Sequence, residues 1–124
     1  MDICFIRSTN HHDQTIVTRQ DGVRLSAPVY GPLDPIPHDL AHFVIEMELG
    51  LRDGLWGSIA GGAILEGMKV ISGRQRPHAK ERSQAIQHAN RQGILYAAAQ
   101  DGRAVVCYDS RLCKSGHVRQ CAKV

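Results

Sequence analysis

Apolar and polar positions alternate through the first thirty residues in a way that predicts β-strands. Three runs are rich in β-branched and aromatic side chains: residues 2–8, 14–19 and 23–30. Asp21-Gly22, between the second and third runs, is a strong tight-turn dipeptide. Pro28 cannot donate a ladder hydrogen bond, so we expect it near a strand end or at a sheet edge. The pattern therefore predicts a small antiparallel β-meander over residues 1–31.

Helical spacing replaces this alternation after a proline-rich connector at residues 31–37. We predict one helix from Pro37 to Leu49, ended by Gly50, and a second over residues 53–66. Gly54, Gly57 and Gly61 recur at helical spacing in the second segment. Each glycine costs a helix about 1 kcal/mol relative to alanine. The stripe thus indicates either close backbone approach to the preceding helix or an irregular loop that lines a pocket.

The C-terminal half is predicted to contain one long helix. Residues 78–100 carry small and apolar residues on one face and charged and amide side chains on the opposite face. Residues 68–72 read as a short strand or a helix continuation, 104–108 as an additional strand, and 110–124 as a loose basic tail. We predict a single α+β domain in which the sheet covers one face of helix 37–49 and the long helix covers the other.

Length and composition limit the class of protein. A chain of 124 residues is one domain, and its 43% apolar and 22% charged residues are ordinary for a globular protein. No apolar run is long enough for a membrane span, and the N-terminus does not read as a signal peptide. A cytoplasmic location is therefore the expectation. Its four cysteines would then be reduced thiols: Cys4, Cys107, Cys113 and Cys121.

Charge is divided unevenly along the chain. Residues 1–50 hold three arginines and seven acids, 3 − 7 = −4, and residues 51–124 hold twelve Lys/Arg and five acids, 12 − 5 = +7. A basic cluster surrounds the 73–77 turn and is a candidate site for an anionic partner: Lys69, Arg74, Arg76, Lys80 and Arg82. The alternative is a solvated basic turn, and no aromatic-rich nucleic-acid motif accompanies the charge. A homo-oligomer is a further candidate assembly.

The stretch PHDLAHFVIE carries the strongest chemical signal in the chain. His38 and His42 lie four residues apart, so on a helix one projects above the other and the pair can hold a zinc ion. The best third ligand is Glu66, with His78 or Glu46 as alternatives. Asp39 stands where an HExxH enzyme has its catalytic glutamate, and its shorter side chain weakens the hydrolase interpretation.

A structural interpretation of the same residues is equally concrete. Asp39 in the first turn of a helix is favoured by the helix dipole. His42 and Glu46, four residues apart, can form an ion pair. The helix carries apolar side chains on two broad faces, which predicts that other elements cover it on both sides. Its polar side chains must therefore find hydrogen-bond partners in the interior.

The run PHDLAHFVIEMELGLRDGLWGSIAGG, residues 37–62, resembles a signature of a group of short, uncharacterised bacterial proteins. The shared pattern is HDLxHxxxE, a Gly-Leu turn and then DGxWGxxAxG. The resemblance implies that the helix and the glycine segment form one unit, with a shared region lined by His38, Asp39, His42, Glu46, Trp56, Gly57 and Gly61. A weaker similarity to zincin HExxH helices covers five residues, with the base position changed.

Two functions follow as hypotheses. The first is a small binding or regulatory protein without a cofactor, whose ligand pocket includes Trp56, Gly57 and Gly61. The second is a zincin-like metal-binding protein or metal-dependent hydrolase. In that case zinc would be held by His38, His42 and Glu66, with Asp39 or Glu46 as the catalytic base.

Overall fold

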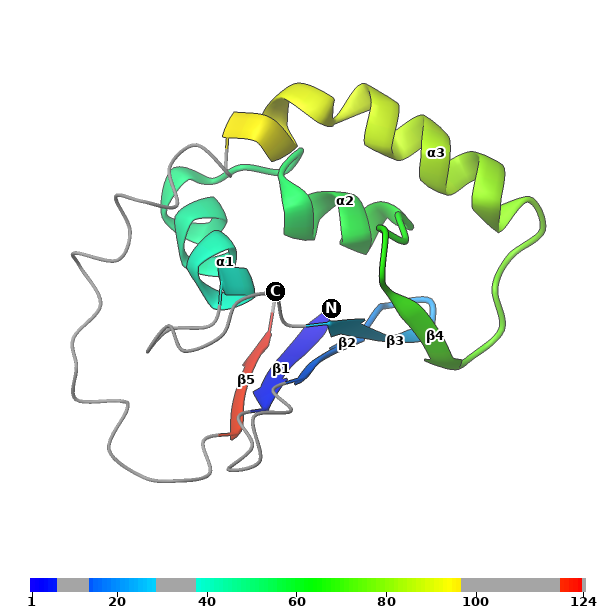
Figure 1. Cartoon of the computed structure of the whole chain (residues 1–124), viewed down its shortest axis with the longest axis horizontal. Helices are drawn as coiled ribbons and strands as arrows, with labels where there is room; N and C mark the ends of the chain where they lie inside the picture. The colour runs from blue at the N-terminus through cyan, green and yellow to red at the C-terminus, as the bar shows by residue number, and fades with distance from the viewer. Residues whose placement is uncertain (7–13, 29–37, 97–118, 124) are drawn as a thin grey trace.

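The computed structural model describes residues 1–6, 14–28, 38–96 and 119–123. The elements within these residues are β1 (Asp2–Ile6), β2 (Gln14–Thr18), β3 (Arg24–Pro28), α1 (His38–Leu49), α2 (Leu55–Gly61), β4 (Lys69–Ser72), α3 (Ala79–Ala89) and β5 (Arg119–Lys123). The strands form one sheet in the order β4-β3-β2-β1-β5, and every neighbouring pair is antiparallel (Figure 1). The predicted α+β class with an N-terminal β-meander is confirmed.

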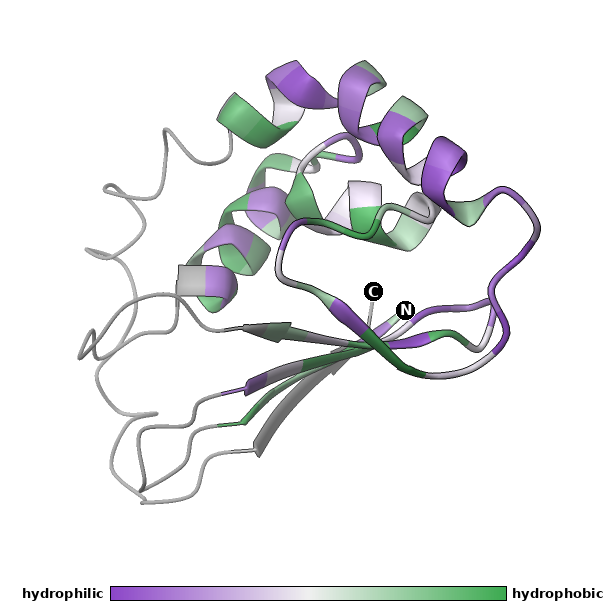
Figure 2. Ribbon diagram, turned by 45° about the vertical axis from the view of Figure 1, so that its right-hand side comes forward, coloured by the Kyte–Doolittle hydropathy of each residue, from purple (hydrophilic) through white to green (hydrophobic). Residues whose placement is uncertain are grey.

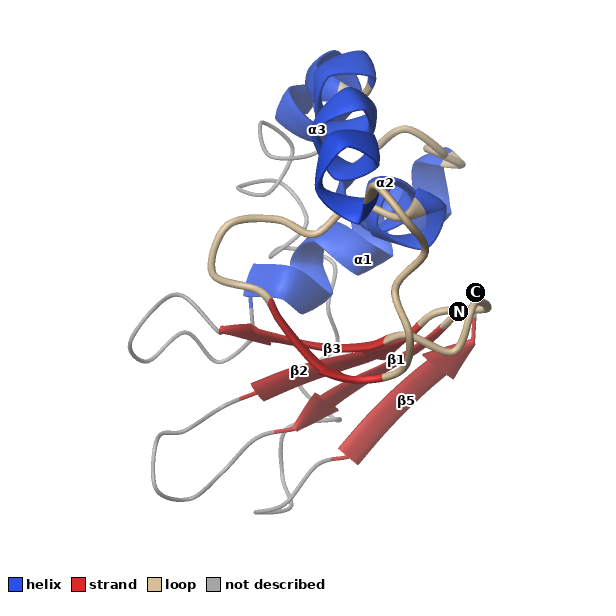
Figure 3. Ribbon diagram, turned by 90° about the vertical axis from the view of Figure 1, so that its right-hand side faces the viewer, coloured by secondary structure: helices blue, strands red, loops and turns tan. Residues whose placement is uncertain are grey.

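The alternation of the meander strands places one row of side chains against the helices. Ile3, Val17 and Leu25 lie directly opposite one another across β1, β2 and β3 and are fully buried. Burial of each such side chain is worth about 1.5–3 kcal/mol. Figure 3 shows the three helices on one side of the sheet. The core therefore lies between this face and the first two helices.

α2 packs between the sheet and α3, as Figure 1 shows. Ile64 donates its backbone N–H to Ser83 Oγ at 2.9 Å, and Asn90 donates from Nδ2 to Ser58 Oγ at 3.0 Å. These bonds hold α3 against α2 and the loop that follows it. We expected the long helix to cover α1, and the structure places it over α2 instead. The reason is local, because the buried position of α3 is Ser83, a polar residue that an apolar pattern does not reveal.

The long-helix prediction needs a correction in its bounds. α3 ends at Ala89, Asn90 forms a turn, and residues 91–96 continue as helix. Figure 2 shows hydrophilic residues along much of the outer side of α3. The rest of the predicted helix and the predicted strand at 104–108 lie outside the described residues.

The C-terminal segment contains a strand that the sequence pattern did not predict. Residues 119–123 form β5, which pairs with β1 along its whole length. Backbone hydrogen bonds can hold an edge strand even where apolar and polar side chains do not alternate. The sequence of β5, RQCAK, shows no such alternation. The expectation of a loose end is therefore wrong for these five residues.

Cys4 on β1 is disulfide-bonded, and the residue directly opposite it on β5 is Cys121. The expectation that all four cysteines are reduced thiols is wrong for Cys4. Within the described part of the chain, none of the helices has the length and apolar character needed to cross a membrane.

Candidate functional site

The three polar side chains that follow His38 along one side of α1 are buried. Asp39, His42 and Glu46 are 8%, 5% and 5% exposed, respectively. The Asp39 carboxylate accepts a hydrogen bond from Thr15 Oγ1 of β2 at 3.1 Å. Thr15 is fully buried, so this bond fixes the start of α1 against the middle of the sheet.

Glu46 performs the capping of α2. Its Oε2 atom accepts hydrogen bonds from the backbone N–H groups of Trp56 at 2.9 Å and Gly57 at 3.3 Å. The N-cap residue, Gly54, has no side chain that could do this. A Cβ atom on Gly54 would overlap the Glu46 carboxyl group, so the glycine makes room for the cap. A carboxylate at a helix N-terminus is also favoured by the helix dipole.

Burial raises the pKa of the Glu46 carboxyl group above its ordinary value. The N–H groups of Trp56 and Gly57 act in the opposite direction, because they stabilise the ionised form. A buried carboxyl with a raised pKa is a common property of catalytic acids and bases. Here the same group has a structural partner, which explains its burial without any reaction.

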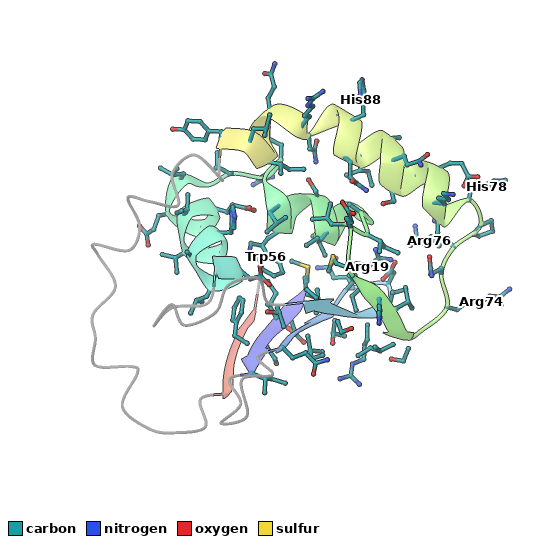
Figure 4. The ribbon with its side chains drawn as sticks, in the orientation of Figure 1. Arg19, Trp56, Arg74, Arg76, His78 and His88 are labelled. Atoms are coloured by element: carbon teal, nitrogen blue, oxygen red, sulfur yellow. The ribbon has the colours of Figure 1, made fainter. Side chains whose placement is uncertain are left out.

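Trp56 ties the other end of α1 to α2. Its indole Nε1 donates to the Asp39 backbone carbonyl at 3.1 Å. The ring packs edge-to-face against Phe5 and Phe43, with centroids 5.9 and 6.5 Å away. Figure 4 shows Trp56 directed from α2 into the space between α1 and the sheet. The indole is 3% exposed and therefore belongs to the core.

The structure brings together some of the residues that the sequence signature groups. Asp39, Glu46, Trp56 and Gly57 are joined by direct hydrogen bonds. Gly61 is exposed, and the nearest side chain to it is Ile86 of α3, so it lies on the other side of α2. These four residues therefore connect α1 to the start of α2.

The predicted metal ligands are distributed differently. His42 is buried, whereas Glu66 is exposed in the turn that follows α2 and His78 is exposed at the start of α3. The position of the His38 side chain lies outside what the structure describes. Among the described residues, no three His, Cys, Asp or Glu side chains are grouped so that they could hold a metal ion.

A second group of functional interest is the basic arm, which we define as residues 69–91: β4, the loop after it, α3 and the start of the next helical turn. It carries six Lys/Arg and one acid, 6 − 1 = +5. All six cations are exposed: Lys69, Arg74, Arg76, Lys80, Arg82 and Arg91. Among the described residues, none of the six forms an ion pair within 4.0 Å with an acidic side chain.

Arg19, just after β2, is a buried cation that the sequence analysis missed. Its side chain is 6% exposed, and its Nε and Nη2 atoms donate to the two carboxylate oxygens of Asp21 at 3.1 and 2.7 Å. This hydrogen bond to Arg19 is the main reason that the pKa of Asp21 is lowered. Asp21 also accepts from the Val23 backbone N–H at 3.1 Å. The available signal was the Asp-Gly turn itself, since an arginine two residues before it can reach the turn carboxylate.

Comparison of the chain with protein-family models, with curated protein sequences and with solved structures finds no match.

Proposed function

We propose that this chain is a small binding protein in which the α1–α2 unit is the scaffold and the basic arm contacts an anionic partner. The observation that carries the proposal is the set of six exposed Lys/Arg side chains without an acidic partner among the described residues. Charges on a surface that serves only solubility are usually mixed in sign. A strong excess of one sign along one arm instead creates a potential that attracts an opposite charge.

The geometry of the arm supports the same proposal. α3 begins after His78, which has no side-chain capping hydrogen bond, so the positive end of the helix dipole adds to the field of the cations. Four of the six cations are arginines, whose planar guanidinium groups bind phosphate and carboxylate in a bidentate manner.

The buried acids of α1 support a scaffold role for the histidine helix. Asp39 is bound to Thr15, and Glu46 caps α2. Both side chains are buried, so a substrate could reach them only if the packing around α1 opened. The zinc hydrolase hypothesis therefore has less support than the binding hypothesis, and it stays a prediction that metal analysis can test.

Fluorescence anisotropy with two labelled probes tests the proposal. A 20-base-pair DNA duplex presents phosphates and polyglutamate presents carboxylates, so their relative affinities identify the class of partner. We expect the logarithm of the binding constant to fall linearly with the logarithm of the salt concentration. Each Arg→Gln change in the arm should lower the size of this slope by about 1 if that arginine contacts a DNA phosphate.

The matched variants are Arg74→Gln in the arm and Arg52→Gln, an exposed cation outside it. The proposal predicts that Arg74→Gln weakens binding much more than Arg52→Gln. Equal effects of the two proteins, or no binding of either probe at low salt, would refute it.

A further inference from the structure

Three segments that are far apart in the sequence meet around Arg19. The first is its own turn, residues 19–23. The second is Gly73, at the start of the β4–α3 loop, where a Cβ atom would overlap the Gly22 carbonyl oxygen and the Val23 Cα atom. The third is Gly62, where a Cβ atom would lie 4.0 Å from Arg19 Nη1. Gly62 thus places backbone, without a side chain, near the guanidinium group, and Gly73 packs against the turn that follows Arg19.

Two nitrogen atoms of this guanidinium group donate hydrogen bonds to Asp21, and the third has no acceptor among the described residues. Asp21 accepts from Nε and Nη2. Nη1 is buried and has no hydrogen-bond acceptor among the described residues. A guanidinium group stays charged at every physiological pH and carries five N–H donors. A buried charged donor without an acceptor is rare in proteins, so this atom points to an acceptor that the described residues do not supply.

Arg76 brings a second guanidinium group to the same place. Its positive charge makes the smallest of the contributions that lower the pKa of Asp21. Figure 4 shows Arg76 on the inner side of the β4–α3 loop, in the direction of Arg19, and Arg74 on the outer side. The two arginines and one aspartate leave a net charge of +1, 2 − 1, beside the unsatisfied Nη1 atom.

We propose that Arg19 and Arg76 form a binding site for a tetrahedral oxyanion of the phosphate class, held between the 19–23 turn and residues 73–76. Two arginines can bind one phosphate through several charge-assisted hydrogen bonds. This inference rests on the proposed function, because it names one point on the basic arm at which a phosphate group of the partner is held. Since Nη1 is buried, the loop at 73–76 must yield to admit the ion, and we expect the free ion to bind weakly.

Two-dimensional NMR of the 15N-labelled chain tests the site with inorganic phosphate as the probe. Sodium phosphate is titrated at pH 7 against sodium chloride of the same ionic strength. We expect saturable shifts of the Arg19 Nε–H signal and of the Gly62 and Gly73 amides with phosphate, and smaller, linear shifts with chloride.

Two variants separate this site from diffuse attraction. Arg76→Gln removes one ligand at an exposed position, so we expect the fold to remain and the phosphate affinity to fall about tenfold. Arg91→Gln removes a charge from the far end of the arm, and we expect a change of less than about twofold. Arg19→Lys keeps the positive charge but removes the planar guanidinium group. We expect this variant to bind phosphate more weakly, and its phosphate affinity is the second measurement.

Several results would overturn the site. One is the absence of a saturable phosphate response beyond that of chloride, and another is an equal loss of affinity in Arg76→Gln and Arg91→Gln. If the DNA and polyglutamate probes still bind in either case, the basic arm keeps its proposed role and only the site is refuted. Loss of all binding to both probes and to phosphate would refute both proposals.

Discussion

Glu46 on α1 caps a helix that begins nine residues later, because its carboxylate accepts the backbone N–H of Trp56 at 2.9 Å. In most helices the N-cap residue itself supplies this acceptor. Here the cap comes from the preceding helix, and the indole of Trp56 returns a hydrogen bond to the Asp39 carbonyl at 3.1 Å. Two bonds in opposite directions thus fix α2 against α1.

We predict that Glu46→Ala lowers the free energy of unfolding by about 2–4 kcal/mol, because the change removes a helix cap and leaves buried N–H groups without an acceptor. Glu46→Gln keeps one acceptor oxygen and should cost less, about 0.5–2 kcal/mol at neutral pH. Urea denaturation of the three proteins measures both values. Equal stabilities of Glu46→Ala and the parent chain would contradict the capping role.

The contribution of Glu46 to the free energy of unfolding should depend on pH with a defined sign. Burial raises the pKa of Glu46, so the folded state holds this proton more tightly than the unfolded state. The resulting contribution to stability is complete below the ordinary pKa, about 4.3, and is lost as pH rises through the raised value. The stability of the parent chain relative to Glu46→Gln should therefore decrease as the pH rises above about 4.3. Asp21 titrates in both proteins, and its contribution cancels in the difference.

Two glycines of α2 should respond in opposite ways to alanine. A Cβ atom on Gly57 would overlap the backbone carbonyl of Arg52, which cannot rotate away, so we expect a loss of about 1–3 kcal/mol. A Cβ atom on Gly61 would lie 3.9 Å from Ile86 Cδ1, an ordinary contact. Gly61→Ala should therefore be neutral or stabilising by up to about 1 kcal/mol. Thermal denaturation of both variants is the measurement, and the reverse order would show that the predicted close approach at Gly57 is absent.

Metal content tests the histidine pair. We predict that the chain purified without a histidine tag contains no stoichiometric zinc, because His42 is buried in the core whereas Glu66, the predicted third ligand, is exposed in the turn after α2. His42→Ala should still lower the free energy of unfolding by about 1–3 kcal/mol, since the side chain is buried. Elemental analysis and melting curves with and without a chelator give the answer. Stoichiometric zinc that is lost in His42→Ala would instead favour the zincin-like hypothesis.

The disulfide of Cys4 can be located by peptide mapping. Cys121 lies directly opposite Cys4 in the antiparallel β1–β5 pair, where Cα atoms are about 4.5–5.5 Å apart, a distance that a disulfide can span. We predict a cross-linked peptide that contains both residues under non-reducing conditions. Reduction should then lower stability by about 2–4 kcal/mol. A cross-link to Cys107 or Cys113 would disprove this pairing, and serine variants at these two positions serve as controls.

The sequence was sufficient where side-chain pattern decides the structure. Alternation placed the first three strands, and the Asp21-Gly22 dipeptide placed the turn between two of them, because local propensity and the buried row Ile3–Val17–Leu25 agree. The sequence was insufficient where backbone pairing or single polar contacts decide. β5 is held by its ladder with β1, and α3 is held through Ser83 and Asn90.

The candidate site, too, was predicted from the sequence only in part. The pattern identified His42, Asp39 and Glu46 as buried polar groups on one helix, and all three are buried. It did not predict that Glu46 caps α2, because that contact depends on the angle between two helices. Arg19 was missed entirely, since a single arginine before a turn has no periodic pattern.

The position of β1 between β2 and β5 has a consequence for synthesis of the chain. β1 meets β2 across a short connection, so this pairing can form early. Its other edge pairs with residues 119–123, which are synthesised long after β1, and closing so large a loop is slow. During that interval β1 offers an open strand edge to other nascent chains. The yield of folded protein should therefore depend on how quickly β5 is synthesised and pairs with β1.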